Sequence, residues 1–299
     1  MKTLLLVLAC LISAVTINAQ TNCLETAREV GPALSAEAQS EFEKKLSEAR
    51  AAYEKENSAE NIIWVGRRTA YLGRYKDAVR IFSDGIKQFP RDARLYRHRG
   101  HRFITLRCLD AAVADFEQAA KLIKGRPDEI EPDGLPNARN LPTSTLQSNI
   151  WYHLGLAHYL KGDFKRALKA YREAERVSNN PDMLVATTHW LYMTLRRLGR
   201  EKEAKRALLP IKDNLELIEN ADYYKLIQVY KGQLDAKKLW DEISNAKSLS
   251  NATLGYGLGN WFLYNGQRAE AEKIFREVTA GNQWASFGFI AAERALDTR

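Results

Sequence analysis

The chain has 299 residues, of which 45% are hydrophobic and 27% charged, and its formal net charge is +8. These proportions exclude a collagen-like or intrinsically disordered chain and suit a globular protein with one large or two ordinary cores. The modest positive excess favours acidic partners without naming one.

Residues 1–19 predict a secretory signal peptide. Lys2 precedes an apolar run from Leu4 to Val15, and the small residue Ala19 precedes a polar stretch. The run is shorter than the roughly 18 apolar residues that a membrane-spanning helix needs. Lipidation at Cys10 is the alternative, but it would leave few apolar residues before the cut. We therefore expect cleavage near Ala19 and an exported protein, periplasmic or secreted, that is soluble after cleavage.

Loss of Cys10 with the signal leaves Cys23 and Cys108. An even pair in an oxidising compartment is able to form a disulfide. Two unpaired, partly buried thiols are the alternative, and the sequence leaves both open.

The N-terminal segment 20–58 contains an amphipathic stretch from Ala36 to Asn57, with Phe42, Leu46 and Tyr53 on one side. We expect a helix there that covers the apolar end of a repeat array.

One pattern recurs four times between residues 59 and 281: a glycine, an alanine twelve residues later, and an aromatic residue four further on. The copies are Gly66, Ala78, Phe82; Gly100, Ala112, Phe116; Gly155, Ala167, Tyr171; and Gly259, Ala271, Phe275. In three copies a turn glycine follows seven residues after the first glycine: Gly73, Gly162 and Gly266. Apolar residues at helical spacing flank each turn, which predicts helix hairpins.

The run Trp151-Tyr152-His153-Leu154-Gly155 resembles the W-x-x-L-G pattern of the tetratricopeptide repeat family. The resemblance covers most of residues 59–281, with repeats 1–2 at 59–124 and repeats 3–6 at 148–281. The fifth is degenerate, because Lys237 stands where alanine is expected. The expected fold is all-α, a right-handed superhelix (α-solenoid) of stacked antiparallel helix hairpins. The family mostly binds proteins and peptides.

Two segments outside the repeats carry open alternatives. Segment 125–147 holds four prolines and an acidic patch, and it is either a surface loop or a strap that folds over the concave face or docks a partner. Segment 282–299 predicts a C-terminal capping helix. The alternative is a docking surface formed by Trp284, Phe287 and Phe289.

A second stripe of polar and aromatic residues runs along the first helices, and the resemblance implies that it lines the concave groove. Guanidinium groups bind carboxylates bidentately and tyrosines cover apolar side chains, so we expect a peptide with acidic residues to bind here. Solvated helix faces are the alternative. The family's lysine–asparagine–arginine clamp is not carried over, since Ile63 and His98 stand at two of its positions. The expected groove residues are Arg67, Tyr71, Arg94, Arg97, His101, Asn149, Tyr152, Tyr159, His189, Arg196, Arg197, Tyr256 and Asn260.

No motif with catalytic spacing is present in the sequence. Four arginines surround His98 and His101 and would repel a metal cation, and nucleic acid suits an exported protein poorly. We therefore expect no metal, no cofactor and no enzyme activity, but an exported scaffold or adaptor for a protein or peptide. The alternatives are a structural subunit of an envelope complex, or an enzyme with a site in the loop and groove.

Overall fold

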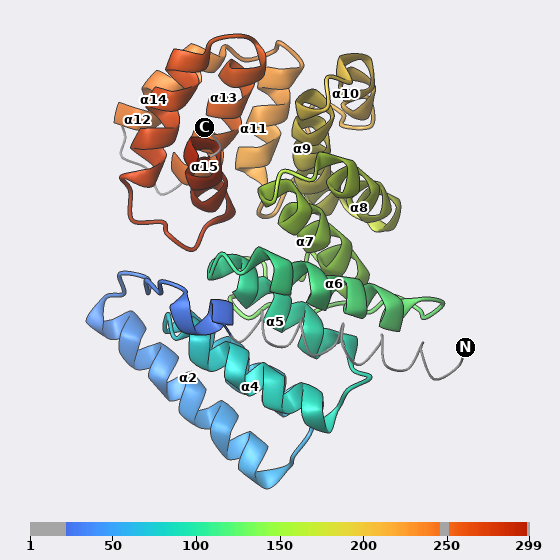
Figure 1. Ribbon diagram of the computed structural model, residues 1–299, viewed down its shortest axis with the longest axis vertical. Helices are drawn as coiled ribbons and strands as arrows, with labels where there is room; N and C mark the ends of the chain where they lie inside the picture. The colour runs from blue at the N-terminus through green and yellow to red at the C-terminus, as the bar shows by residue number, and fades with distance from the viewer. Residues whose placement is uncertain (1–21, 246–250, 298–299) are drawn as a thin grey trace. The chain divides into compact units, whose positions relative to one another are not determined.

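The computed structural model describes residues 22–245 and 251–297, and its regular structure is helical (Figure 1). Within these ranges, the only extended pairing is a single bridge between Ile130 and Thr145. The predicted signal peptide, residues 1–19, lies outside the described residues. The chain divides into two compact units: unit 1 comprises residues 1–30 and 34–122, and unit 2 comprises residues 31–33 and 123–299.

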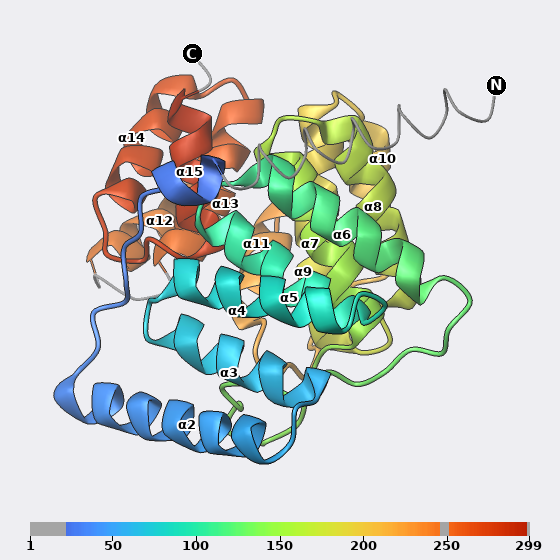
Figure 2. The same ribbon diagram turned by 60° about the horizontal axis from the view of Figure 1, so that its bottom comes forward.

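Unit 1 consists of a covering helix and two helix hairpins. The covering helix α2 starts after Ser35, whose side chain accepts a hydrogen bond from the backbone N–H of Ala38, and it packs against α3 (Figure 2). The helices are α2 (Ala36–Lys55), α3 (Ala59–Tyr71), α4 (Tyr75–Gln88), α5 (Ala93–Thr105) and α6 (Leu109–Ile123).

The repeated glycines are explained by close helix packing. A Cβ atom at Gly66 would lie 2.3 Å from the ring of Phe82, and one at Gly100 would lie 2.9 Å from Phe116. The turn glycine Gly73 has a φ of 79°, and at the equivalent turn of the second repeat Arg107 takes a φ of 63°. The second repeat therefore makes the same turn without glycine, at the cost of a left-handed arginine.

A largely buried ion pair lies within the second hairpin of unit 1 and is linked to the first hairpin through Ser83. Arg99 donates to both carboxylate oxygens of Asp115, at 2.8 and 2.7 Å, and to the hydroxyl of Ser83 at 3.0 Å. Asp115 is 2% exposed. Because these residues lie on α5, α6 and α4, the pair fixes three helices at once.

A disulfide joins Cys23 to Cys108. It returns the N-terminal segment, in which residues 22–26 are helical, to the turn before α6. The carboxylate of Glu29 also accepts a hydrogen bond of 2.6 Å from the backbone N–H of Lys76 at the start of α4. The segment is thereby anchored to unit 1 at two places.

Unit 2 contains the remaining helices. The hairpins α7–α8 and α13–α14 are the most closely packed, and the degenerate repeat is irregular, because α11 packs against α9 and α13 while α12 packs against α13. The bounds are α7 (Leu146–Leu160), α8 (Phe164–Val177), α9 (Pro181–Arg197), α10 (Glu201–Ala207), α11 (Ala221–Tyr230), α12 (Ala236–Asn245), α13 (Asn251–Tyr264), α14 (Arg268–Thr279) and α15 (Phe287–Asp297).

The C-terminal helix α15 covers the last hairpin and packs on α13 and α14. It also reaches α7, where Arg294 donates to the carbonyl oxygen of Leu160 at 3.2 Å. Trp284 and Phe289 are buried and Phe287 is half-buried, which favours the covering role over the docking surface.

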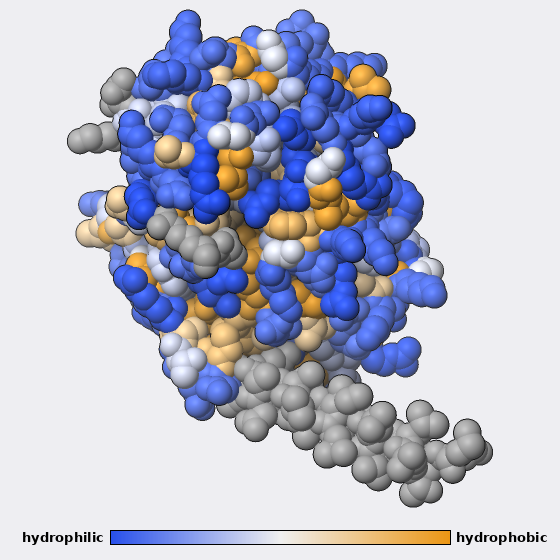
Figure 3. Space-filling model, turned by 45° about the horizontal axis from the view of Figure 1, so that its top comes forward, coloured by the Kyte–Doolittle hydropathy of each residue, from blue (hydrophilic) through white to orange (hydrophobic). Residues whose placement is uncertain are grey.

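The all-α class and the stacked helix hairpins are confirmed. The face drawn in Figure 3 is mostly hydrophilic, with apolar residues in smaller groups between the polar ones. In the described ranges, no helix combines the length and apolarity required to cross a bilayer.

Candidate functional site

The predicted groove residues fall into two environments. In unit 1, Arg67, Tyr71, Arg94 and His101 are half-buried, and Arg97 is 8% exposed. Of the predicted groove residues in unit 2, only Arg196 and Arg197 are half-buried. The other six predicted residues of unit 2 are at most 7% exposed: Asn149, Tyr152, Tyr159, His189, Tyr256 and Asn260.

Arg94 is held by carboxylates of its own chain. Its guanidinium contacts Glu60 at 2.7 Å and Asp92 at 2.7 Å, and Asp92 also caps the start of α5. Arg94 therefore ties the two hairpins of unit 1 together, and its charge is engaged by carboxylates of the chain itself. A signal was present in the sequence: Glu60 precedes Arg94 by one repeat length, so the two occupy the same position in adjacent hairpins.

Two other arginines of unit 1 lack a carboxylate partner among the described residues. The Arg67 guanidinium lies 4.5 Å from the Trp64 ring centre and donates to the Tyr71 hydroxyl at 3.4 Å. The Arg102 guanidinium lies 5.8 Å from the ring centre of Tyr75. Both cations thus lie against aromatic rings, and no carboxylate among the described residues neutralises either of them.

Arg67, Arg97 and Arg102 together form what we call the arginine cluster. Burial lowers the pKa of Arg102 to about 10, and the positive charges of Arg97 and Arg67 act in the same direction. Burial therefore makes the charged form of Arg102 costlier than in water, and an anion beside it would offset that cost. Arg102 was not among the expected groove residues.

In unit 2 the predicted stripe forms a closed interior. The Tyr256 hydroxyl donates to that of Tyr159 at 2.8 Å, and the Asn260 amide donates to the same oxygen at 2.9 Å. Burial raises the pKa of Tyr159. Tyr159 and Tyr256 belong to hairpins far apart in the chain, so this face closes because distant hairpins meet, and these residues are not available at the surface of this structure.

His189 lies in the same interior and is 1% exposed. Its Nδ1 lies 3.1 Å from the Tyr230 hydroxyl, and its ring stacks on Tyr223 with the ring centres 4.7 Å apart. Burial lowers its pKa to about 3. The neutral imidazole therefore shares a hydrogen bond with the tyrosine hydroxyl and serves packing.

The two arginines at the end of α9 also make contacts within unit 2. Arg196 donates to the Tyr192 hydroxyl at 3.2 Å and to the carbonyl oxygen of Tyr264 at 3.3 Å. The Arg197 guanidinium lies 4.7 Å from the ring centre of Phe164. Arg196 thus joins α9 to the end of α13.

The loop 125–147 folds against unit 2. Asp128 accepts hydrogen bonds from the Thr145 hydroxyl at 2.6 Å and the backbone N–H of Gln147 at 3.0 Å, so the loop closes at the start of α7. Glu219 accepts hydrogen bonds from Thr143 and Asn137, at 2.7 and 2.8 Å. The loop exposes three large apolar residues, Ile130, Leu135 and Leu141.

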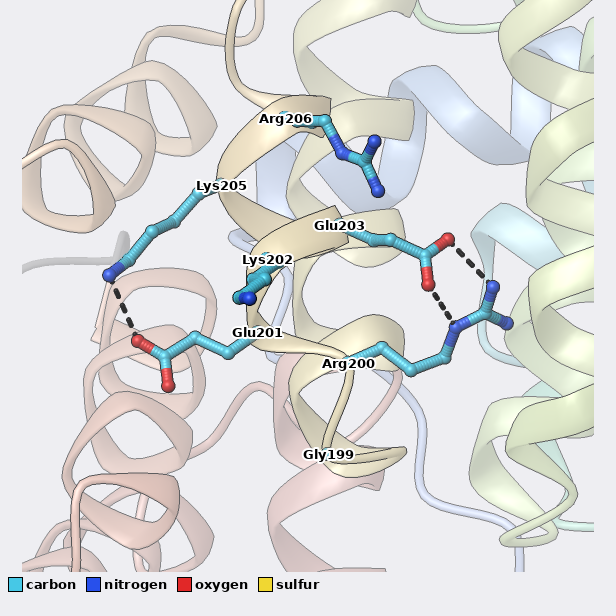
Figure 4. Close-up of a pocket in the computed structure, with 7 residues that line it drawn as sticks. All are labelled: Gly199, Arg200, Glu201, Lys202, Glu203, Lys205 and Arg206. Carbon is cyan, nitrogen blue, oxygen red and sulfur yellow. Dashed lines mark hydrogen bonds and ion pairs between the residues drawn. The ribbon is translucent and has the colours of Figure 1, made fainter.

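An open surface hollow lies around α10 and is lined by charged residues of that helix (Figure 4). Arg200 pairs with Glu203 at 2.6 Å and Lys205 with Glu201 at 3.0 Å, on opposite sides of the helix. Among the described residues, no group of three histidine, cysteine or carboxylate side chains could hold a metal ion.

The sequence model of the tetratricopeptide repeat family matches residues 148–181, which comprise most of α7, all of α8 and the first residue of α9. The resemblance to this repeat family that the sequence indicates is thereby confirmed for one hairpin, residues 148–181. No curated protein matches the chain.

Several solved structures are similar to the chain at low identity. YrrB, described as a TPR protein with an unusual peptide-binding site, is 15% identical, with 83% of this chain and 97% of that chain covered and a TM-score of 0.44. A tetratricopeptide repeat protein from Parabacteroides merdae ATCC 43184 is 12% identical, with 94% and 100% covered and a TM-score of 0.49. The P58(IPK) TPR domain is 16% identical, with 88% and 76% covered and a TM-score of 0.33.

Proposed function

We propose that this chain is an exported, non-catalytic scaffold that binds an acidic protein segment at the arginine cluster of unit 1. The tetratricopeptide repeat is a protein-interaction module, which supports the scaffold part of the proposal. The site is assigned to unit 1 because there the first-helix stripe is charged and half-buried, whereas in unit 2 it is closed.

The observation that carries the proposal is the pair Arg67 and Arg102. Neither contacts a carboxylate of the described residues, and both lie against aromatic rings. A guanidinium forms bidentate hydrogen bonds with a carboxylate, and these bonds are strongest where water is partly excluded. Tyr71 adds an aromatic surface for the apolar part of a bound chain. An aspartate or glutamate of a partner would thus supply the missing anion.

Export is supported by two features. The signal-peptide pattern of residues 1–19 precedes the cysteine pair, and the Cys23–Cys108 disulfide suits an oxidising compartment. N-terminal sequencing of the protein from its native cells tests this part. We expect a mature chain that starts near Gln20, and a chain that retains Met1 in the cytosol would overturn it.

Peptide binding is tested with two fluorescent octapeptides, one of glutamate and one of glutamine. We expect the glutamate peptide to bind, the glutamine peptide to fail, and binding to weaken as salt rises. The double substitution R67Q/R102Q is expected to weaken binding at least tenfold. The matched control K238Q/K273Q removes the same charge from exposed sites of unit 2 and is expected to leave the affinity nearly unchanged. An equal loss in both variants would show that only the net charge matters and would refute the site.

A further inference from the structure

The outward side of α8 is predominantly basic. Lys165, Lys169, Arg172 and Arg176 are all exposed, and their spacing of four, three and four residues places them along one side of the helix. The opposite side is buried through residues such as Ala167 and Tyr171. The helix therefore presents charge to solvent and keeps its apolar side in the core.

Helix α10 adds further cations. Residues 164–177 and 201–207, which form α8 and α10, carry eight basic and four acidic side chains, an excess of four positive charges. The charges of Arg172 on α8 and Arg206 on α10 both help to lower the pKa of Glu203, after its hydrogen bond to Arg200. Both helices pack against α9 and lie near each other in Figures 1 and 2, so their exposed cations are on neighbouring parts of unit 2.

Four cations of this surface have no carboxylate partner among the described residues: Lys165, Lys169, Lys202 and Arg206. The acidic residues present are already paired, Glu175 with Arg172 at 2.8 Å and Glu173 with Arg176 at 2.9 Å, besides the two pairs of α10. In Figure 4, Lys202 lies between the two ion pairs of α10. We call these four cations the outer basic face.

An exposed leucine follows α10 directly. Leu209 is 78% exposed, and its backbone N–H donates to the carbonyl oxygen of Arg206 at 3.2 Å. In such an i to i+3 turn, residues three apart lie on the same side, so Leu209 is next to the outer basic face. The surface combines several unneutralised cations with one protruding apolar side chain.

We propose that the outer basic face docks the protein onto an anionic membrane surface, with Leu209 entering the headgroup region. Lysines without ion-pair partners are attracted to the anionic headgroups of a membrane. This attraction needs no specific geometry, because the lipids are mobile. None of the four cations or Leu209 offers an aromatic ring for stacking on bases, which disfavours single-stranded nucleic acid. Since the apolar side of α8 is already buried in unit 2, the helix would lie on the membrane without inserting into it.

The affinity follows from the number of cations. Each lysine or arginine near an anionic bilayer strengthens binding about fivefold, so four of them give several hundredfold. Such binding is reversible and falls as salt rises. It leaves the arginine cluster of unit 1 to the partner, so the two sites are separable by mutation.

Vesicle sedimentation tests the proposal with vesicles of pure phosphatidylcholine and with vesicles in which one lipid in three is phosphatidylglycerol. We expect the protein to bind the anionic vesicles only, and to be released by salt. The variant K165Q/K169Q/K202Q/R206Q is expected to lose at least a hundredfold in affinity, and L209S several-fold. A matched control, K124Q/K212Q/K238Q/K273Q, removes the same charge from exposed lysines elsewhere in unit 2 and is expected to lose less than tenfold.

Three outcomes would overturn the proposal: no binding of the unmodified protein to anionic vesicles at low salt, equal losses in the two quadruple variants, or binding to double-stranded DNA in place of vesicles. Circular dichroism establishes that each variant is folded. Binding of the glutamate octapeptide by the first quadruple variant would persist, which separates a failure of this site from a failure of the arginine cluster.

Discussion

The buried imidazole of His189 makes the stability of unit 2 sensitive to acid. Burial lowers its pKa to about 3 in the folded chain, whereas the unfolded chain has the ordinary value near 6.5. Between these two pH values the unfolded state binds a proton that the folded state does not. The contribution of this residue is therefore complete above pH 6.5 and is lost as the pH falls towards 3.

The magnitude follows from the separation of the two pKa values. Each pH unit below 6.5 costs about 1.4 kcal/mol, so acidification to pH 5 removes about 2 kcal/mol of the free energy of unfolding. The stacked rings of Tyr223 and Tyr230 would attract an imidazolium and reduce this loss in part. The remaining loss, about 1 to 2 kcal/mol, is measurable in a domain of ordinary stability.

Urea unfolding followed by circular dichroism, at intervals between pH 7.5 and 5, measures this loss. The substitution H189Q keeps a side chain that can hydrogen-bond the Tyr230 hydroxyl and removes the titrating group. Between pH 6.5 and pH 5, we expect the free energy of unfolding of H189Q to fall by about 1 to 2 kcal/mol less than that of the unmodified protein. The control Y230F removes the hydrogen bond and keeps the imidazole buried, so it is expected to retain the acid sensitivity. If the free energy of unfolding fell equally with pH in H189Q and in the unmodified protein, the reasoning would be refuted.

Three further predictions concern the packing of unit 1. G66A is expected to lose about 1 to 2 kcal/mol by overpacking and G100A less, because the ring near Gly100 leaves more room; equal urea midpoints would contradict this order. D115A leaves Arg99 without its carboxylate in a largely buried place and is expected to lower the free energy of unfolding by about 3 to 5 kcal/mol. D77A removes an exposed ion pair and is expected to lower it by less than about 1 kcal/mol. A calorimetric ranking in the opposite order would refute the burial argument. C108S removes the disulfide and is expected to lower the free energy of unfolding of unit 1, measured in urea, by about 2 to 5 kcal/mol. An unchanged free energy of unfolding would show that other contacts hold the N-terminal segment.

The hairpins could be predicted from the sequence because their cause is local. A glycine and an aromatic residue sixteen positions apart face each other across one turn, as Gly155 and Tyr171 do, where an added Cβ would lie 2.7 Å from the ring. Because this close contact requires a glycine opposite an aromatic ring, it leaves a fixed spacing of these two residues in every repeat of the sequence. The caps are local too, since Thr145 and Ser148 form a reciprocal capping box at the start of α7.

The accessibility of the groove could not be predicted, because it depends on how distant hairpins meet. Helical spacing placed Tyr159 and Tyr256 on the inner stripe, but it carried no information on the separation between their helices. A small rotation between successive hairpins decides whether residues so far apart in the chain touch, and no pattern within one repeat records that angle. The outer basic face was not predicted for another reason: its cations lie on second helices, whereas the repeat pattern points to the first helices as the ones that line the groove.

The composition of the inner stripe explains why it closes in unit 2, whereas in unit 1 every member except Arg97 remains half-buried. Tyrosine and asparagine side chains satisfy one another when buried, as the hydroxyl of Tyr159 does with two donors, so their burial costs little. A guanidinium has no acceptor to offer another guanidinium, and burying it without an anion costs several kcal/mol. Arg67 and Arg102 therefore oppose the closure that tyrosines permit. The residue type on the stripe thus separates a structural interior from a surface that a carboxylate of another protein would complete.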